Sequence, residues 1–118
     1  MNKIRLNQFF NLSEFECPCC NKVMISETLL EKLFKFRTTI DKPIEINSGY
    51  RCPEYNKIVK GSETSYHIKG MAVDISVKGM TLYDLYQIAL QLNFTGIGFY
   101  ELKNFLHLDV RPGKLSEW

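Results

Sequence analysis

The sequence predicts an α+β fold in which a small antiparallel sheet has helices packed on one side. Residues 72–77 and 105–110 alternate between apolar and polar side chains, which is the period of a strand with one buried face. Residues 26–39 and 81–92 instead repeat apolar side chains every three or four positions, as amphipathic helices do. Because both patterns occur in one short chain, we expect the helices to cover one face of a shared sheet.

The first predicted helix has clear start and stop signals. Ser26 is a suitable N-cap, because its hydroxyl can accept a hydrogen bond from a backbone N–H of the first turn. The run Asp41-Lys42-Pro43 ends the helix. Residues 44–47 then alternate again and are expected to form a short strand.

The later elements follow from similar signals. Pro53 suits the first turn of a short helix that reaches about residue 59. Thr81 is the expected N-cap of the second long helix, and Asn93 closes that helix. Residues 97–100 are expected to form a further strand before the one at 105–110.

Length and composition favour a single globular unit. A chain of 118 residues is expected to form one domain over 1–118 and to bury roughly two-thirds of its unfolded surface. Residues 1–8 and 112–118 are candidates for loose tails. We expect a monomer.

Charge and hydropathy give no indication of nucleic-acid binding, a membrane span or a secretory signal. A net charge of +2 is too small to indicate nucleic-acid binding. The apolar runs are only a few residues long, so no membrane-spanning helix is expected. The first ten residues lack the apolar segment and cleavage site of a secretory signal.

The only two histidines fall beside the two best-defined strands. Asp74 and His107 lie on the polar faces of those strands, so one sheet would project both side chains into one site. His67 would reach that site from the preceding loop. Two imidazoles and one carboxylate form a ligand set typical of catalytic zinc, with the fourth position left to water. The alternatives are a loop histidine bonded to backbone and an aspartate in a salt bridge.

These residues belong to a recognisable motif, Ser65-x-His67-x-x-Gly70-x-Ala72-x-Asp74 followed by His107. The motif resembles that of the zinc D-Ala-D-Ala carboxypeptidases of the M15 peptidase family, whose fold group includes the hedgehog signalling domain. The runs Ser48-Gly49-Tyr50-Arg51 and Gly96-Ile97-Gly98-Phe99-Tyr100 also resemble that family, and the likeness covers roughly residues 9–111.

The resemblance implies a zinc metallopeptidase that cleaves stem peptides or cross-links of bacterial peptidoglycan, as a carboxypeptidase or an endopeptidase. His67, Asp74 and His107 would hold one Zn²⁺, which activates water as the nucleophile. Ser65 would help to hold the substrate, or it is a simple loop hydroxyl. Arg51 could grip a substrate carboxylate through two hydrogen bonds, or it is a surface arginine paired with Glu45 or Glu54.

This chain lacks an acid–base residue at the positions where better-known relatives carry their general base. Many of them have a glutamate three residues before the second histidine or a histidine two residues before it, where this chain has Asn104 and Phe105. Asp109 is on the same strand face as His107, about 7 Å further along, and is the predicted catalytic base. Its alternative role is to orient a metal ligand. Glu101 is the reserve candidate.

Four cysteines remain unexplained by this site: Cys17, Cys19, Cys20 and Cys52. A thioredoxin-like redox motif would need a strand-to-helix context that the first three lack. They could form a second, structural zinc site, a disulfide, or free thiols.

Three functions remain open from the sequence. The first is the zinc peptidase, made in the cytoplasm and acting on the cell wall, by phage-type release or as part of a virion by analogy. The second is a zinc-bearing binding module that has lost catalysis, which the missing glutamate favours. The third is a structural phage protein.

Overall fold

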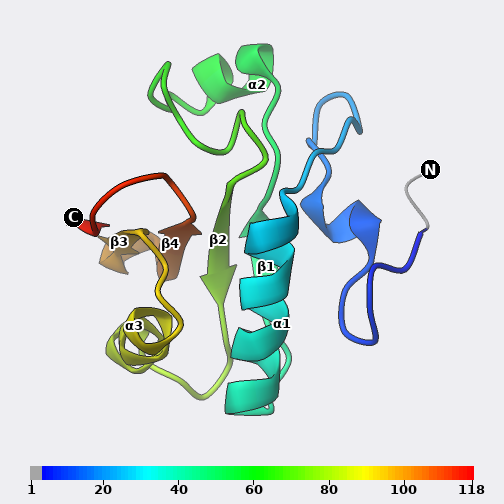
Figure 1. Cartoon of the computed structure of the whole chain (residues 1–118). Helices are drawn as coiled ribbons and strands as arrows, with labels where there is room; N and C mark the ends of the chain where they lie inside the picture. The colour runs from blue at the N-terminus through cyan, green and yellow to red at the C-terminus, as the bar shows by residue number, and fades with distance from the viewer. Residues whose placement is uncertain (1–3) are drawn as a thin grey trace.

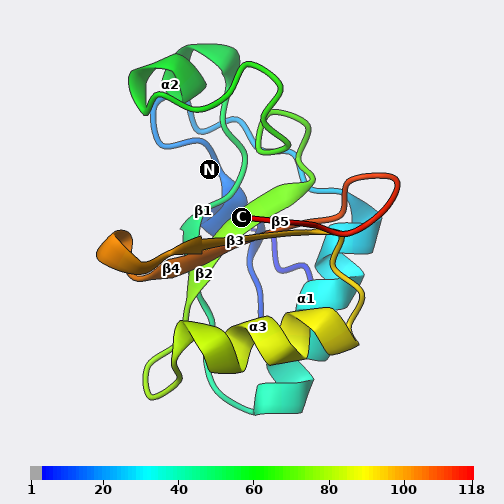
Figure 2. The same ribbon diagram turned by 90° about the vertical axis from the view of Figure 1, so that its left-hand side faces the viewer.

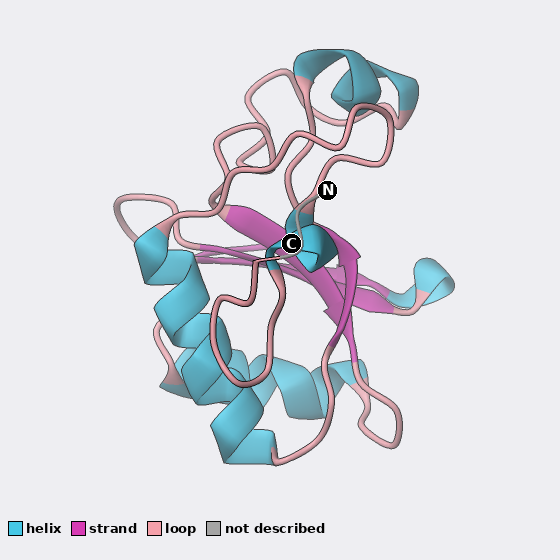
Figure 3. Cartoon of the chain, turned by 90° about the vertical axis from the view of Figure 1, so that its right-hand side faces the viewer, coloured by secondary structure: helices cyan, strands magenta, loops and turns pink. Residues whose placement is uncertain are grey.

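The computed structural model describes residues 4–118, and from α1 to β4 its helices and strands alternate along the chain (Figures 1 and 3). In chain order the elements are η1 (Leu12–Phe15), α1 (Glu27–Ile40), β1 (Glu45–Ser48), α2 (Pro53–Ile58), β2 (Ala72–Ser76), α3 (Leu82–Gln91), β3 (Gly96–Tyr100), η2 (Glu101–Lys103), β4 (Phe105–Asp109) and β5 (Ser116–Glu117).

The five strands form one sheet in the order β1-β2-β4-β3-β5. The pairs β1–β2, β2–β4 and β3–β4 are antiparallel, as predicted. The sheet is mixed at one edge, where the short strand β5, which was not predicted, runs parallel to β3. After β4 the chain turns back and runs alongside β3. Without β5, the outer edge of β3 would have unpaired backbone N–H and C=O groups.

The predicted layering is confirmed. Helices α1 and α3 lie on one side of the sheet, whereas α2 and the loops around it lie on the other side (Figure 2). The inward faces of β2 and β4, which include Val73, Ile75, Leu106 and Leu108, pack in the core with buried side chains of both long helices. The polar faces of the same strands therefore point away from the helices.

The predicted helix signals act as expected. The Ser26 hydroxyl accepts a hydrogen bond from the Leu29 N–H at 3.1 Å, and the Thr81 hydroxyl accepts one from the Asp84 N–H at 3.1 Å. Asp41 ends α1 in the left-handed conformation, with φ of 51°. Within residues 4–118, no helix has the length and apolarity needed to cross a membrane.

Both predicted tails contain ordered backbone contacts, and residues 1–3 lie outside the described residues. Near the N-terminus, the Leu6 N–H donates to the Phe10 carbonyl at 2.9 Å. At the other end, the Trp118 N–H donates to the Ile97 carbonyl at 3.0 Å, and the Phe99 N–H donates to the Trp118 carbonyl at 2.8 Å. The free edge of β3 explains this order, because it supplies partners for the last strand.

Candidate active site

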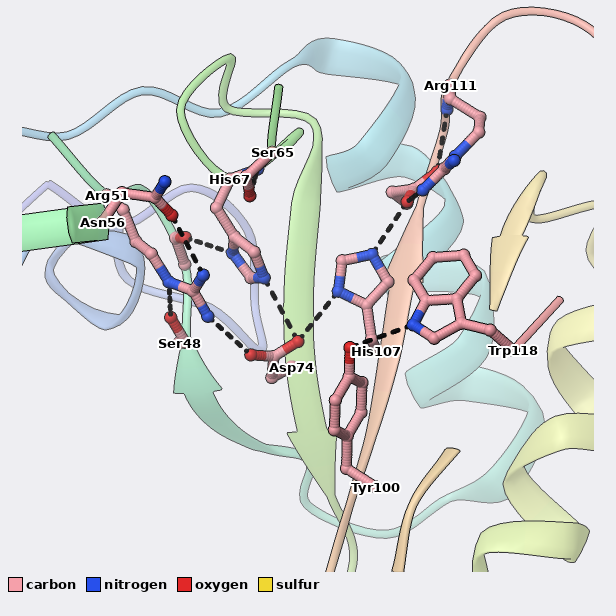
Figure 4. A network of polar contacts seen from close by, with 12 residues as sticks. Ser48, Arg51, Asn56, Ser65, His67, Asp74, Tyr100, His107, Arg111 and Trp118 are labelled. Carbon is pink, nitrogen blue, oxygen red and sulfur yellow. Dashed lines mark hydrogen bonds and ion pairs between the residues drawn. The ribbon is translucent and has the colours of Figure 1, made fainter. Parts of the chain in front are cut away.

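The polar face of the sheet brings the three predicted metal ligands together (Figure 4). Asp74 of β2 and His107 of β4 are direct cross-strand neighbours, so their side chains leave the same face of the sheet. His67 reaches them from the loop before β2. One ligand atom from each of the three residues lies within 4.8 Å of the others, and all three side chains are buried.

In each imidazole, the ring nitrogen that points away from Asp74, here called the outer nitrogen, is hydrogen-bonded to a fixed acceptor. His67 Nδ1 lies 2.7 Å from the Gly49 carbonyl oxygen, and His107 Nε2 lies 2.8 Å from Asp109 Oδ2. Because a carbonyl and a carboxylate can only accept, we assign the ring hydrogens to these outer nitrogens. In the neutral rings, the inner nitrogens His67 Nε2 and His107 Nδ1 therefore present lone pairs.

Both inner nitrogens face one carboxylate oxygen. Asp74 Oδ1 lies 3.2 Å from His67 Nε2 and 3.0 Å from His107 Nδ1. Three acceptors that converge in a buried place require a cation between them, either a proton or a metal ion. Burial alone would raise the pKa of Asp74, yet His107 and His67, when their inner nitrogens carry a proton, hold this pKa at about 2. The carboxylate is thus ionised at neutral pH, and the chemistry of this donor set fits Zn²⁺.

Arg51 holds the other oxygen of the same carboxylate. Its Nη2 donates to Asp74 Oδ2 at 3.2 Å, its Nη1 donates to Asn56 Oδ1 at 3.3 Å and its Nε donates to Ser48 Oγ at 3.2 Å. The guanidinium is therefore fixed on three sides. It is paired with neither of the glutamates that the sequence offered, and it directs Oδ1 of Asp74 toward the histidines.

Asp109 is buried beside His107 and is held by a second arginine. Arg111 donates to both carboxylate oxygens, from Nε to Oδ1 at 2.9 Å and from Nη2 to Oδ2 at 2.6 Å. Burial alone would raise the pKa of Asp109, but the bonds from Arg111 and His107 hold this pKa well below its usual range. Burial would likewise lower the pKa of His107, but Asp109 and Asp74 raise it.

Two glycines of β3 make room for this arrangement. A side chain at Gly96 would overlap the carboxylate of Asp109, and a side chain at Gly98 would come within 2.6 Å of the Trp118 indole. Gly98 is the direct cross-strand neighbour of His107. Both positions therefore need a residue without a side chain, for reasons of close approach.

The ligands open into a cavity of about 510 Å³. Four cationic side chains line it: Arg51, Lys60, Lys103 and Arg111. Asp74 is the one carboxylate among the described lining residues. The cavity is thus positively charged before any metal binds, which favours an anionic ligand.

Aromatic side chains form another part of the cavity wall. The Trp118 indole lies 5.1 Å from the His107 ring, between ring centres, and donates from Nε1 to the Tyr100 hydroxyl at 2.9 Å. The Arg111 guanidinium lies 4.7 Å from the Tyr66 ring centre and 4.9 Å from that of Trp118. From the sequence alone, no role in the site was assigned to Tyr66, Tyr100, Arg111 or Trp118.

The remaining predicted residues differ in position. Ser65 lines the cavity, and its hydroxyl accepts a hydrogen bond from the His67 N–H at 3.2 Å, so it supports the turn that carries His67. Glu101 is exposed in η2. The four cysteines Cys17, Cys19, Cys20 and Cys52 form a separate group of possible metal ligands.

Comparisons with known proteins agree with this geometry. A family model described as peptidase M15 matches residues 8–109. The peptidoglycan L,D-endopeptidase MepK of Escherichia coli (strain K12) is 30% identical over 118 aligned residues, which cover 93% of this chain and 62% of that protein. MepK of Shigella flexneri gives the same values.

A further relative is the probable peptidoglycan L,D-endopeptidase MepK of Haemophilus influenzae, which is 32% identical over 92 residues, or 71% of this chain and 50% of that protein. The chain thus spans less than two-thirds of the length of these curated relatives. The family model nevertheless covers most of the chain, and the resemblance seen in the sequence motif is confirmed: the chain belongs to the peptidase M15 family.

Proposed function

We propose that this protein is a zinc-dependent peptidase that cleaves peptide bonds in bacterial peptidoglycan. The observation that carries the proposal is the convergence of His67 Nε2, His107 Nδ1 and Asp74 Oδ1, with both outer ring nitrogens already engaged. The relatives named as peptidoglycan L,D-endopeptidases support an endopeptidase rather than a D-Ala-D-Ala carboxypeptidase. This function would place the protein at the cell wall.

The three residues would hold Zn²⁺ through their inner atoms. Zinc bound in such a site supplies a Lewis acid that polarises a carbonyl group and lowers the pKa of water to about 7. The chain contributes the orientation of the ligands: the Gly49 carbonyl fixes the His67 ring, Asp109 fixes the His107 ring and Arg51 fixes Asp74.

The cavity would select an anionic peptide. Its lining cations can pair with carboxylates, which peptidoglycan stem peptides carry at their ends and side chains. Arg51 is already bonded to Asp74, so Lys60 and Lys103 are the better candidates for direct carboxylate contacts. Trp118 and Tyr100 would cover the side of the substrate that lies over β3.

Asp109 fits the second of its two predicted roles better than the first. Its lowered pKa and its bonds to Arg111 and His107 oppose proton uptake from water. We therefore propose that Asp109 positions His107 and fixes its tautomer. Glu101 is exposed, and we do not assign it the role of catalytic base.

The test is a digest of purified peptidoglycan, followed by mass spectrometry of the released fragments. We expect new peptide ends that disappear with His107→Ala and with a chelator, and that return when zinc is added back to the wild-type protein. Glu31→Gln, on the exposed side of α1, is the control and should cleave normally. Cleavage that persists in protein shown to lack zinc would refute the proposal.

A second function, a zinc-bearing module that binds the same peptides without cutting them, is favoured by one observation. Among the described residues that line the cavity, Asp74 is the one carboxylate, and it is already a candidate metal ligand. If this function is correct, wild-type protein binds muropeptides, releases no fragment at any zinc concentration, and loses binding in His107→Ala.

A further inference from the structure

Four sulfur atoms converge where the N-terminal loop meets the start of α2. The Sγ atom of Cys17 lies 3.6 Å from that of Cys19 and 3.6 Å from that of Cys52, and the Cys19 and Cys52 sulfurs are 3.3 Å apart. The sulfur of Cys20 lies within 4.8 Å of the other three. None of the four residues lines the cavity described above. The group is therefore a separate site.

The spacing of these sulfurs matches the edges of a zinc–thiolate tetrahedron. With Zn–S bonds of about 2.3 Å, tetrahedral geometry separates neighbouring sulfurs by about 3.8 Å. A disulfide would join only one pair and would leave the third close sulfur of this group without a role. The mutual approach of three sulfurs around one point is the geometry that a shared ion produces.

The backbone is folded so that the sulfurs face one another. The Cys17 N–H donates to the Lys22 carbonyl at 2.7 Å, and the Asn21 N–H donates to the Cys17 carbonyl at 2.9 Å. Asn21 has a φ of 61°, a left-handed conformation that asparagine tolerates, and this closes the turn. The turn brings Cys19 and Cys20 back toward Cys17.

Backbone N–H groups also point at two of the sulfurs. The Cys52 N–H donates to Cys17 Sγ at 3.5 Å, and the Tyr55 N–H donates to Cys52 Sγ at 3.4 Å. Such donors stabilise a sulfur that carries negative charge, as a metal-bound thiolate does. Cys17 and Cys52, which receive these bonds, are buried, whereas Cys19 and Cys20 close the site from the exposed side.

We propose that Cys17, Cys19, Cys20 and Cys52 bind a structural zinc ion that fastens the loop at 16–22 to the segment at 49–52. Four thiolates fill the tetrahedron and leave no position for water or substrate, so the ion would stabilise the fold rather than react. Binding releases the protons of the coordinated thiols.

The segment at 49–52, which this zinc ion would hold, also supports the His67 ring through Gly49. Gly49 accepts the hydrogen bond from His67, and a side chain at Gly49 would come within 2.7 Å of the Phe15 backbone. The Tyr50 N–H donates to the Phe15 carbonyl at 2.8 Å. The zinc–cysteine site would therefore hold in place the loop from which the metal-binding histidine is oriented. The inference does not depend on the proposed peptidase activity.

The test uses cobalt in place of zinc on the full chain, kept reduced. Cobalt bound by thiolates gives a strong near-ultraviolet charge-transfer band, which nitrogen and oxygen ligands do not give. We expect about two metal ions per chain and the thiolate band in wild-type protein. Cys52→Ser should lose the band and about one ion. Serine can still accept the N-cap bond from Tyr55, so α2 should be retained.

The His67→Ala/His107→Ala double variant is the matched control for the other centre. It should lose the second ion and keep the thiolate band, so failure of the peptidase proposal leaves this result unchanged. Wild-type protein that is fully reduced and saturated with cobalt but shows no thiolate band would overturn the inference. So would Cys52→Ser protein that retains both the band and the full metal content.

Discussion

The two candidate metal centres of this protein are built in opposite ways. The histidine centre lies on the sheet, where β2 and β4 set Asp74 and His107 opposite each other, and it opens into a cavity. The cysteine group lies on irregular segments and receives its ligands from residues 17–20 and from Cys52. Two of the three candidate ligands of the histidine centre are thus fixed by paired strands, whereas four thiolates can themselves order the loops that carry them.

The sharpest separation of the two centres is expected from His67→Ala. If His67 holds a catalytic zinc ion, its loss should lower peptidoglycan cleavage by at least about a thousandfold, because such an ion contributes several kcal/mol to catalysis. The thiolate–cobalt band should stay unchanged. Cys52→Ser should lose this band and lower the melting temperature, and its cleavage should fall less than that of His67→Ala, because the cysteine site acts on His67 only through the loop that carries Gly49. Equal effects of both variants on cleavage and on the band would show that the centres are not independent.

The next largest effect is expected at Asp109, the residue that orients the His107 ring. Asp109→Asn should weaken metal binding at the histidine centre by about 10- to 100-fold, as loss of such a partner usually does, and should leave the cysteine centre unchanged. The measurement is a metal titration with cleavage assayed at each zinc level. Asp41→Asn, at an exposed aspartate, is the control.

The same titration distinguishes the two predicted roles of Asp109. If Asp109 positions His107, saturating zinc should restore much of the cleavage rate. If zinc affinity is normal but turnover falls by about 10²–10⁴-fold, Asp109 is the general base, and our assignment is wrong.

A smaller effect is expected where the C-terminal strand reaches the cavity. Trp118→Ala removes the indole beside His107 and its bond to Tyr100, so KM for a stem peptide should rise about fivefold, the size expected for one aromatic contact. Turnover and metal content should stay near wild type. Leu102→Ala, at a fully exposed apolar residue, should leave KM unchanged. A fall in metal content in Trp118→Ala would instead assign the indole to the support of His107.

The smallest effect is a change in acid stability. In metal-free protein, a carboxyl whose folded pKa is lowered stabilises the fold above its unfolded pKa of about 3.9 and loses this contribution as the pH falls. The pKa of Asp109 is lowered, so wild-type stability should drop below about pH 4 more steeply than that of Asp109→Asn. His107, with its raised pKa, is protonated in both states there and adds no slope. Urea unfolding at several pH values measures the difference, and equal slopes would contradict it.

The strands and helices could be predicted because their patterns are local. The alternation at Val73, Asp74 and Ile75 places the aspartate on one face and the core residues on the other, and the structure has this arrangement. The same period, extended by one step beyond His107 and Asp109, would have included Arg111 on the site face. The run Pro112-Gly113 that follows instead suggests the start of a tail and hides the role of Arg111.

The other contacts depend on pairings between distant segments, which no local pattern carries. The sequence does not indicate that Trp118 returns along the edge of β3, or that Gly96 and Gly98 face Asp109 and the indole. The bond from Arg51 to Asp74 likewise depends on a loop fold fixed through Asn56. These partners become apparent only when the strands are assembled.

The most direct test of the central claim is a crystal structure of the zinc-loaded protein with anomalous scattering at the zinc edge. We expect an ion about 2.0–2.2 Å from His67 Nε2, His107 Nδ1 and an oxygen of Asp74, while Gly49 and Asp109 keep their bonds to the outer nitrogens. An ion bound through His67 Nδ1 or His107 Nε2, or a histidine centre without zinc in crystals grown with excess zinc, would contradict the account.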